Sequence, residues 1–324
     1  NDGRQLCRAY REYDVESPRP DWAEINPDLV TDSCFAVIKE ATAKIGNNSV
    51  VGLGISSQGE AFSVLDREGN AIYKALPSFD GRAVEYAHNF SKDFGLDKLY
   101  RITGHTPHPM FSLFKLLWLR DNEKSVWDRA WKFLCFEDLL EYRLGIEDPA
   151  IGWPLAGRTM LFDVTKHIWH PDILEALGIR EDQLARPLRS GSIAATLSDE
   201  MAGMLGLKMG CFVVTGGHDQ PCSALGGGAV SPGIGVYSTG TVECITPAFE
   251  KPVFSEELRK HNLCTYDHTA PGLYATVAFN LTGGNILKWF RDQFGKEELL
   301  EAEKNGADPY DLLLHVAGDE PSSL

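Results

Sequence analysis

The segment at residues 211–228, CFVVTGGHDQPCSALGGG, constrains the fold of this chain more than any other. Its apolar start predicts a buried strand, which breaks at two glycines followed by His218, Asp219 and Gln220. A carboxylate without a partner is costly to hold at the end of a buried strand. The segment therefore predicts one of two arrangements. Asp219 either faces a cleft, where it accepts a proton from a hydroxyl, or lies in a glycine-rich turn, where it bonds its own backbone.

Helical and strand patterns alternate along the rest of the chain. Apolar residues from Val30 to Ile45 recur at helical spacing, and this helix is expected to end at Gly46. Residues 49–76 are expected to form successive strands of one sheet, followed by a mainly helical region between about 85 and 208. Further strands are predicted at residues 211–215, 233–238, 242–247 and 273–280, and an amphipathic helix at 285–295.

Composition bounds the classes of protein that this chain can be. Its 324 residues, 43% of them hydrophobic, suffice for about two domains, and the glycine-rich segment at 224–233 is the best candidate for a joint between them. The net charge of -15 argues against binding to a nucleic-acid backbone. The seven cysteines lack a C-x-x-C pair, which argues against zinc and favours a reducing compartment. No apolar run is long enough to span a membrane, so we expect a cytoplasmic protein.

Glycine-containing segments and polar strand ends supply weaker signals. STGT at 238–241 can approach an anion or form a plain hairpin turn, and TGGN at 282–285 can bind phosphate at a helix N-terminus or simply cap that helix. Gln58 and Glu60 can bind a polyhydroxylated ligand or face solvent at a hairpin end. Asp80 and Arg82 can belong to a site or form a surface ion pair.

The order of these segments resembles the FGGY family of carbohydrate kinases. GISSQGEAFSVLDREGNAIYKALPSFDGR is similar to that family's G-I-S-x-Q strand with its hairpin and D-x-R segment, and HPMFSLFKLLWLRDN resembles its P-x-F-x-x-x-K-x-x-W-L helix. The segment from EDLLEYRLGI to HPDILEALGI, GGHDQPCSALGGGAVSPGIGVYSTGT and GGNILKWFRDQFG match the later motifs in the same order. The resemblance covers nearly the whole chain.

The resemblance implies an α/β fold of the actin-like ATPase type, in which two ribonuclease-H-like domains close on ATP, magnesium and a sugar. It implies a sugar-binding N-terminal domain at residues 1–227 and the first part of the ATP-binding C-terminal domain at 228–324. Asp219 would be the general base. The implied substrate-binding residues are Gln58, Gly59, Glu60, Asp80, Arg82, Met110 and Gln220, and the implied nucleotide-binding residues are Gly240, Thr241, Gly284 and Lys288.

Departures from the family pattern leave alternatives open. The family's opening D-x-G-T strand, whose aspartate helps bind magnesium, is not in this sequence, and the later adenine-binding motif is also outside it, so we expect a fold that is partial at both ends. The metal ligands are therefore unknown. A sugar-binding pseudokinase is the alternative to an active kinase, and a hydrolase built on His218 and Asp219 is a third reading that lacks a G-x-S-x-G nucleophile motif.

The substrate and partners follow only in part from the resemblance. Gly59 and Glu60 after Gln58 differ from the Met-His of many ketose kinases and from the Arg-Glu of glycerol kinases, so the expected substrate is a small sugar or polyol without a closer identity. A homodimer is one arrangement that the resemblance allows. No nucleic acid or membrane is expected as a partner.

Overall fold

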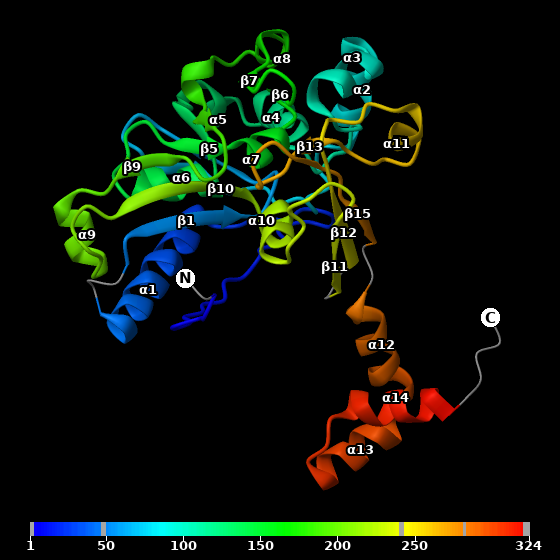
Figure 1. The fold of residues 1–324 in the computed structure, drawn as a ribbon. Coiled ribbons are helices and arrows are strands. Elements are labelled where there is room, and N and C mark those ends of the chain that lie inside the picture. Colours follow the sequence, from blue (N-terminus) through cyan, green and yellow to red (C-terminus); the bar gives the residue numbers. More distant parts are fainter. Residues whose placement is uncertain (1–2, 47–49, 240–242, 281–282, 320–324) are drawn as a thin grey trace. The chain divides into compact units, whose positions relative to one another are not determined.

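A computed structural model describes residues 3–46, 50–239, 243–280 and 283–319 of the chain. Contacts within the chain divide it into two units, one made of residues 1–234 and 247–276 and the other of residues 235–246 and 277–324. The first unit is a mixed α/β structure in which helices pack around several small sheets (Figure 1). In the part of the chain that the structure describes, no helix is both long and apolar enough to cross a membrane.

Most helices of the first unit coincide with the helix predicted before Gly46 or lie within the predicted helical region between about 85 and 208, whereas the last two were not predicted. The helices are α1 (Pro27–Ile45), α2 (Val84–Phe94), α3 (Leu96–Thr103), α4 (Ser112–Asn122), α5 (Lys124–Arg129), α6 (Phe136–Arg143), α7 (Trp153–Gly157), α8 (Pro171–Leu177), α9 (Asp199–Leu205), α10 (Asp219–Gly226) and α11 (Glu256–Lys260), with a short 3₁₀ helix at Glu181–Gln183. Asn26 caps the start of α1, because its side chain accepts a hydrogen bond from the Asp28 N–H. The helix ends before Gly46, as the sequence predicts.

A three-stranded sheet with the order β1-β10-β9 lies at the centre of the first unit. Strands β1 (Gly52–Ser57) and β10 (Phe212–His218) are parallel, and β9 (Ile193–Thr196) is antiparallel to β10. Apolar residues of this sheet pack with α6 and α9 in one core, against which α1 adds Phe35 and Ile38. Burial of that core fixes which face of each strand points inward.

The last residues of β10 approach β1 more closely than any side chain would allow. A Cβ atom at Gly216 would lie 2.0 Å from the carbonyl oxygen of Ile55, and the strand register shifts between Ile55 and Ser56 at this point. Gly217 has a φ of 116°, which a residue with a side chain rarely adopts. Both glycines of TGGH are therefore required by the backbone.

Glu137, at the start of α6, links this sheet to a second pair of strands. Its two carboxylate oxygens accept hydrogen bonds from the backbone N–H of Gly216 (2.8 Å) and of Gly152 (3.0 Å), and the side chain is fully buried. Gly152 ends β5 (Ala150–Gly152), which pairs in parallel with β8 (Arg186–Leu188). Burial raises the pKa of Glu137 to about 8.

The expectation that residues 49–76 form successive strands of one sheet is wrong. Strands β2 (Phe62–Leu65) and β3 (Ala71–Tyr73) form a separate antiparallel sheet with β4 (Lys132–Cys135), whereas β1 pairs with β10. The reason lies in the connection between β1 and β2, where Glu60 has a left-handed φ of 64°. That turn takes the chain out of the first sheet before β2 begins.

The remaining strands of the first unit are short. Strands β6 (Phe162–Asp163) and β7 (Ile168–Trp169) form a hairpin, and β13 (Tyr266–Asp267) pairs with β14 (Tyr274–Ala275), which pairs in turn with the end of β12 (Glu243–Phe249). Elements of two to four residues carry too little pattern to be recognised, so the strands within the expected helical region were missed.

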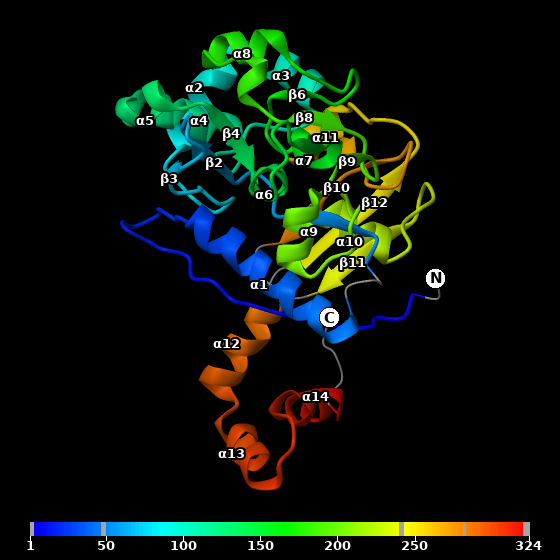
Figure 2. The ribbon, with the colours of Figure 1, turned by 90° about the vertical axis from the view of Figure 1, so that its left-hand side faces the viewer.

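The second unit contains β11 (Gly235–Thr239), the start of β12 and β15 (Ala278–Asn280), which pairs with β12. The expected strand at 273–280 is in fact two strands, β14 and β15. Helices α12 (Gly284–Phe294), α13 (Lys296–Asn305) and α14 (Pro309–Asp319) follow and pack on one another (Figure 2).

We predict that Glu137→Ala lowers the free energy of unfolding by roughly 1–3 kcal/mol, because the buried backbone N–H groups of Gly152 and Gly216 both lose their acceptor. Chemical denaturation at pH 5 measures the change, because the stability cost of the raised carboxyl pKa accumulates only as the pH rises from about 4.5 to about 8. Glu147→Ala, at an exposed position on the segment after α6, is the matched control and should leave the stability unchanged. Equal stabilities of the two variants would contradict the role given to Glu137.

Candidate active site

The carboxyl ends of β1 and β10 meet at one edge of the central sheet. Ser57 lies opposite His218 in the register, so Gln58 to Glu60 leave β1 beside the point where Asp219 leaves β10. Ligands of α/β proteins bind at this end of parallel strands. The topology therefore brings together two of the sequence segments that were separate candidates.

Glu60 is fixed by its backbone and its side chain together. Its carbonyl oxygen accepts a hydrogen bond from Ser112 Oγ (2.7 Å) at the start of α4, and only 3% of the residue is exposed. Its carboxylate accepts hydrogen bonds from two nitrogens of the Arg158 guanidinium, Nε and Nη2. The carboxylate is therefore held by a buried ion pair and does not face solvent at a hairpin end.

Arg158 is a site residue that the sequence reasoning did not select. It follows α7 directly and lies in an aromatic enclosure, with its guanidinium carbon 4.9 Å from the centre of the Phe111 ring and 5.7 Å from that of Tyr266. Its Nη2 also lies 3.9 Å from Met110 Sδ, which places one predicted substrate-binding residue beside Glu60. Its sequence signal is weak, because it is an arginine in AGRTM, inside the matched segment from EDLLEYRLGI to HPDILEALGI, with no local pattern that marks it as a site residue.

His218 contacts both Tyr266 and Asp219. The Nδ1 atom of His218 lies 2.9 Å from the Tyr266 hydroxyl, and its Nε2 atom lies 3.2 Å from Asp219 Oδ1. His218 and Tyr266 are both buried, whereas 49% of the Asp219 side chain is exposed. One oxygen of Asp219 is therefore held on the protein side, and the carboxylate remains accessible from the other side.

The electrostatic surroundings suit Asp219 to proton transfer near neutral pH. Burial, followed by the negative charge of Glu60, raises the pKa of Asp219 to about 6, although the Gln220 backbone N–H and Arg158 act in the opposite direction. A carboxylate with a pKa near the working pH is both ionised and basic enough to accept a proton.

Asp80 and Arg82 form a buried ion pair, so the alternative of a surface ion pair is wrong. Arg82 Nε lies 2.9 Å from Asp80 Oδ1, the second Asp80 oxygen accepts the Ala23 backbone N–H (2.7 Å), and Arg82 Nη2 bonds Glu24 (2.9 Å). The guanidinium carbon lies 3.9 Å from the centre of the Trp22 ring. The pair thus links the loop after β3 to the segment before α1, a bracing arrangement.

Lys115 on α4 fixes the same loop from the other side. The residue is fully buried, and its Nζ donates hydrogen bonds to the carbonyl oxygens of Leu76 (2.9 Å) and Pro77 (2.8 Å). Burial lowers its pKa to about 7, while the charges of Glu60 and Asp80 act to raise it. The ammonium group of Lys115 therefore interacts electrostatically with both Glu60 and Asp80.

The other predicted site residues have fewer contacts. Gln58 and Gln220 are half-buried and, within the described residues, their side chains form no hydrogen bond. Gly284 is the first residue of α12 and Lys288 lies exposed one turn later, both in the second unit. Gly240 and Thr241 lie outside the residues that the structure describes. Among the described residues, no three His, Cys, Asp or Glu side chains come together as a metal site.

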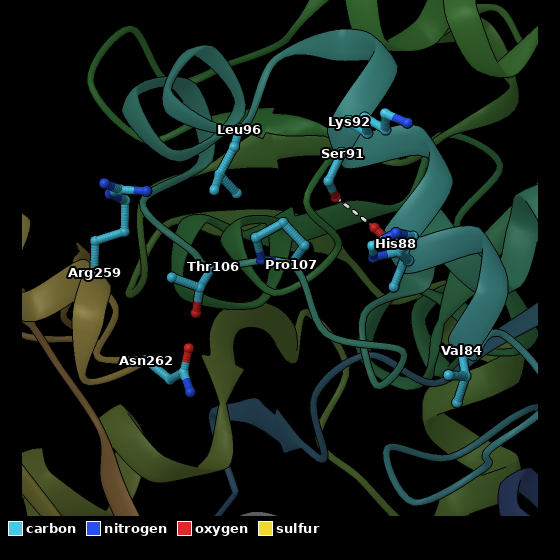
Figure 3. Close-up of a pocket in the computed structure, with 10 residues that line it drawn as sticks. Val84, His88, Ser91, Lys92, Leu96, Thr106, Pro107, Arg259 and Asn262 are labelled. Atoms are coloured by element: carbon cyan, nitrogen blue, oxygen red, sulfur yellow. Dashed lines mark hydrogen bonds between the residues drawn. The ribbon is translucent and has the colours of Figure 1, made fainter.

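A separate pocket of about 510 Å³ in the first unit lies between α2 and the segment that contains α11. Figure 3 shows Arg259 and Asn262 on one side of it and His88 and Ser91 on the other, with Pro107 between them. No aspartate or glutamate is among the residues that line this pocket. The cluster around Asp219 is the better candidate for the chemistry, because it combines a carboxylate with the carboxyl ends of two parallel strands, where ligands of α/β proteins bind.

Comparison with known families gives a match over most of the chain. The model of the N-terminal domain of the FGGY family of carbohydrate kinases matches residues 1–226. The xylulose kinase of Lactococcus lactis is 27% identical over 296 residues, which are 91% of this chain and 58% of the relative. The autoinducer-2 kinase of Escherichia coli K12 is 30% identical over 285 residues, 86% of this chain and 52% of the relative. The chain thus spans about half the length of these curated relatives.

Solved structures agree on the fold. A ligand-bound xylulose kinase from Lactobacillus acidophilus superposes with a TM-score of 0.84 at 22% identity, over 96% of this chain and 60% of that protein. A glycerol kinase from Plasmodium falciparum, solved with ADP, gives a TM-score of 0.77 at 21% identity, over 91% and 60%. The expected actin-like α/β fold is confirmed by these similarities.

We predict that Arg82→Met destabilises the protein by roughly 3–5 kcal/mol, because it leaves the buried carboxylate of Asp80 and the half-buried carboxylate of Glu24 without their cation. Urea unfolding of the variant measures the loss. Arg101→Met removes an ion pair with Asp97 in which both side chains are more than 60% exposed, and it should cost less than about 1 kcal/mol. Similar losses in the two variants would show that the buried pair is not a brace.

Proposed function

Because the chain belongs to the FGGY family of carbohydrate kinases, we propose that it carries the sugar-binding site and the general base of an ATP-dependent kinase that phosphorylates a small sugar or polyol. The single observation that carries this proposal is Asp219, a half-exposed carboxylate with a pKa of about 6 at the end of β10. It lies beside Glu60 and Arg158, which form the buried wall of the same region.

The proposed step transfers the γ-phosphoryl group of ATP to a hydroxyl of the substrate. The hydroxyl oxygen forms a bond to the γ-phosphorus, the bond from that phosphorus to the bridging oxygen of ADP breaks, and the hydroxyl proton passes to Asp219. Removal of the proton as the new bond forms makes the alcohol a competent nucleophile. Most of the remaining rate enhancement in such reactions comes from holding the reactants in line.

Residues around Asp219 supply groups for recognising a polyhydroxylated substrate. Gln58 and Gln220 have side-chain amides without protein partners in the described part of the chain, and amides both donate to and accept from hydroxyls. The Glu60 carboxylate is neutralised by Arg158, so it can accept a hydroxyl while adding little net charge. The names of the relatives, which include xylulose, autoinducer-2, gluconate and glycerol kinases, support a small polyhydroxylated substrate.

ATP is the proposed phosphoryl donor. The proposed sugar-binding domain comprises residues 1–227, and the proposed nucleotide-binding domain begins at residue 228 and includes residues 228–324. Gly284 and Lys288 would bind the nucleotide together with Gly240 and Thr241. Magnesium usually binds through one or two carboxylates plus substrate phosphates. The described residues do not assemble a metal site, so none of the steps above is assigned to the metal. A cytoplasmic location and a homodimer remain predictions.

We predict that Asp219→Asn lowers kcat by roughly 10²- to 10⁴-fold, because the amide cannot accept the hydroxyl proton. ADP formation by the purified protein is measured with a panel of ketoses, polyols and sugar acids, and sugar binding by calorimetry. Sugar affinity should be retained. Turnover like that of the parent protein would remove Asp219 from the role, and sugar binding without ADP formation by the parent would favour the pseudokinase.

Thermal unfolding provides the control for this variant. The folded pKa of Asp219 lies above the ordinary value of 3.8, so its ionisation costs stability as the pH rises from about 4 to about 6. At pH 8, Asp219→Asn should therefore unfold at a temperature no lower than that of the parent. A marked loss of stability would mean that the activity change reflects misfolding.

A second prediction concerns the pH dependence of turnover. If the ionised form of Asp219 is the base, kcat should fall about tenfold for each pH unit below about 6, since the protonated fraction rises there. The pH–rate profile measures this limb, and Asp219→Asn should lack it. A profile that stays level down to pH 4.5 would contradict the assignment.

A further inference from the structure

His218 is a buried histidine for which the proposed reaction has no proton-transfer step. It precedes the general base directly, only 5% of it is exposed, and each ring nitrogen lies within hydrogen-bond distance of another side chain. Its ring centre also lies 5.9 Å from that of Tyr266. A polar ring enclosed in this way needs an explanation beyond core packing, because each of its nitrogens must be satisfied.

Burial and the neighbouring positive charge keep the imidazole of His218 neutral. Burial, followed by the positive charge of Arg158 and by His105, lowers its pKa well below the ordinary value of 6.5. His105 is itself buried and its pKa is lowered to about 3, so it adds no positive charge at neutral pH. The Asp219 carboxylate lies 3.2 Å from Nε2 and does not offset these effects.

A neutral imidazole carries a single N–H, and the neighbours decide where it lies. Tyr266 is fully buried and the pKa of its hydroxyl is raised well above 10, so this hydroxyl is protonated and can donate to Nδ1. A proton on Nδ1 would leave the lone pair of Nε2 facing the Asp219 carboxylate, which is repulsive. A proton on Nε2 would instead point toward Asp219 Oδ1, which lies 3.2 Å away, and would leave Nδ1 free to accept from the Tyr266 hydroxyl.

Gly59 fixes the third side of the imidazole. A Cβ atom at position 59 would lie 3.0 Å from both Cδ2 and Nε2 of His218 and 3.5 Å from Arg158 Nε. The ring therefore occupies the space into which a side chain at this position would extend. This close contact explains why a glycine stands between Gln58 and Glu60, since its φ is not positive and no turn requires it.

We propose that His218 is a positioning residue for Asp219. The facing Asp219 carboxylate favours the tautomer protonated at Nε2, Tyr266 donates to Nδ1, and Gly59 fixes the ring. The Nε2–H then holds Asp219 Oδ1 so that the second carboxylate oxygen faces the substrate hydroxyl. The inference rests on the proposed function, in which Asp219 is the general base. His218 neither accepts nor releases a proton in the reaction, because its N–H already serves the carboxylate.

Two amide substitutions separate this role from packing. In His218→Gln the amide nitrogen lies near the former Nε2 position and can still donate to Asp219, whereas in His218→Asn it lies near Nδ1 and cannot. We expect His218→Asn to lower kcat roughly 10- to 100-fold, with the KM for sugar little changed, and His218→Gln to recover most of that loss. Equal kcat values for the two variants would overturn the proposal.

Gly59→Ala tests the same role without altering a polar group. The added methyl group should displace the imidazole by a few tenths of an ångström and lower kcat several-fold, again with little change in KM. Gly54→Ala is the matched control in the preceding strand, because no atom lies within 4 Å of the Cβ that it would add. A Gly59→Ala variant that retains the kcat of this control would count against positioning through His218.

Nitrogen NMR of ¹⁵N-histidine-labelled protein gives a readout that does not depend on activity. The His218 signals should show a neutral ring protonated at Nε2 between pH 5.5 and 8, and Tyr266→Phe should alter the Nδ1 shift. An imidazolium or a proton on Nδ1 would overturn the inference. If Asp219→Asn kept full activity while the tautomer was as expected, the proposed function would fail and the His218 geometry would stand.

Discussion

The parallel pairing of β1 with β10 is the constraint on which the candidate site depends. The two strands are more than 150 residues apart in the sequence, yet their register places the Gln58–Glu60 segment beside Asp219. Gly216 permits the close approach to Ile55, and the carboxylate of Glu137 holds the end of β10 against β5. A polar group buried at this junction is acceptable because both of its oxygens are satisfied by backbone N–H groups.

The charged side chains around the site have partners within the protein, except that the Asp219 carboxylate remains accessible to a substrate. Glu60 is paired with Arg158 and Asp80 with Arg82, while Lys115 donates to two backbone carbonyls. Each of these groups is held in place by partners within the protein, and breaking such pairs is costly. Asp219 differs because about half of its side chain is exposed and its contact with His218 engages one oxygen. The same burial that raises its pKa also makes it a better base.

Several features of the site could be predicted from the sequence, but its geometry could not. The apolar run before Asp219, the helix at Pro27–Ile45 and the helix at Ser112–Asn122 carry local patterns, which is why they were recognised. Arg158 and Tyr266 carry no such signal, because their importance comes from contacts with residues about 50 to 100 positions away in the sequence. For the same reason, the sequence could not show that the Asp80–Arg82 ion pair is buried. Burial of this pair depends on Trp22 and on the segment before α1.

The sequence by itself determined the family, the α/β character and the identity of the candidate base, because these reside in local periodicity and in the order of short motifs. The tertiary structure alone decided which strand pairs with β1, that the Asp80–Arg82 pair is buried, and that Arg158, Tyr266 and His218 surround the Glu60–Asp219 region. The physical reason is that burial, pairing and pKa are properties of the neighbours in space, and distant segments supply those neighbours only once the chain has folded.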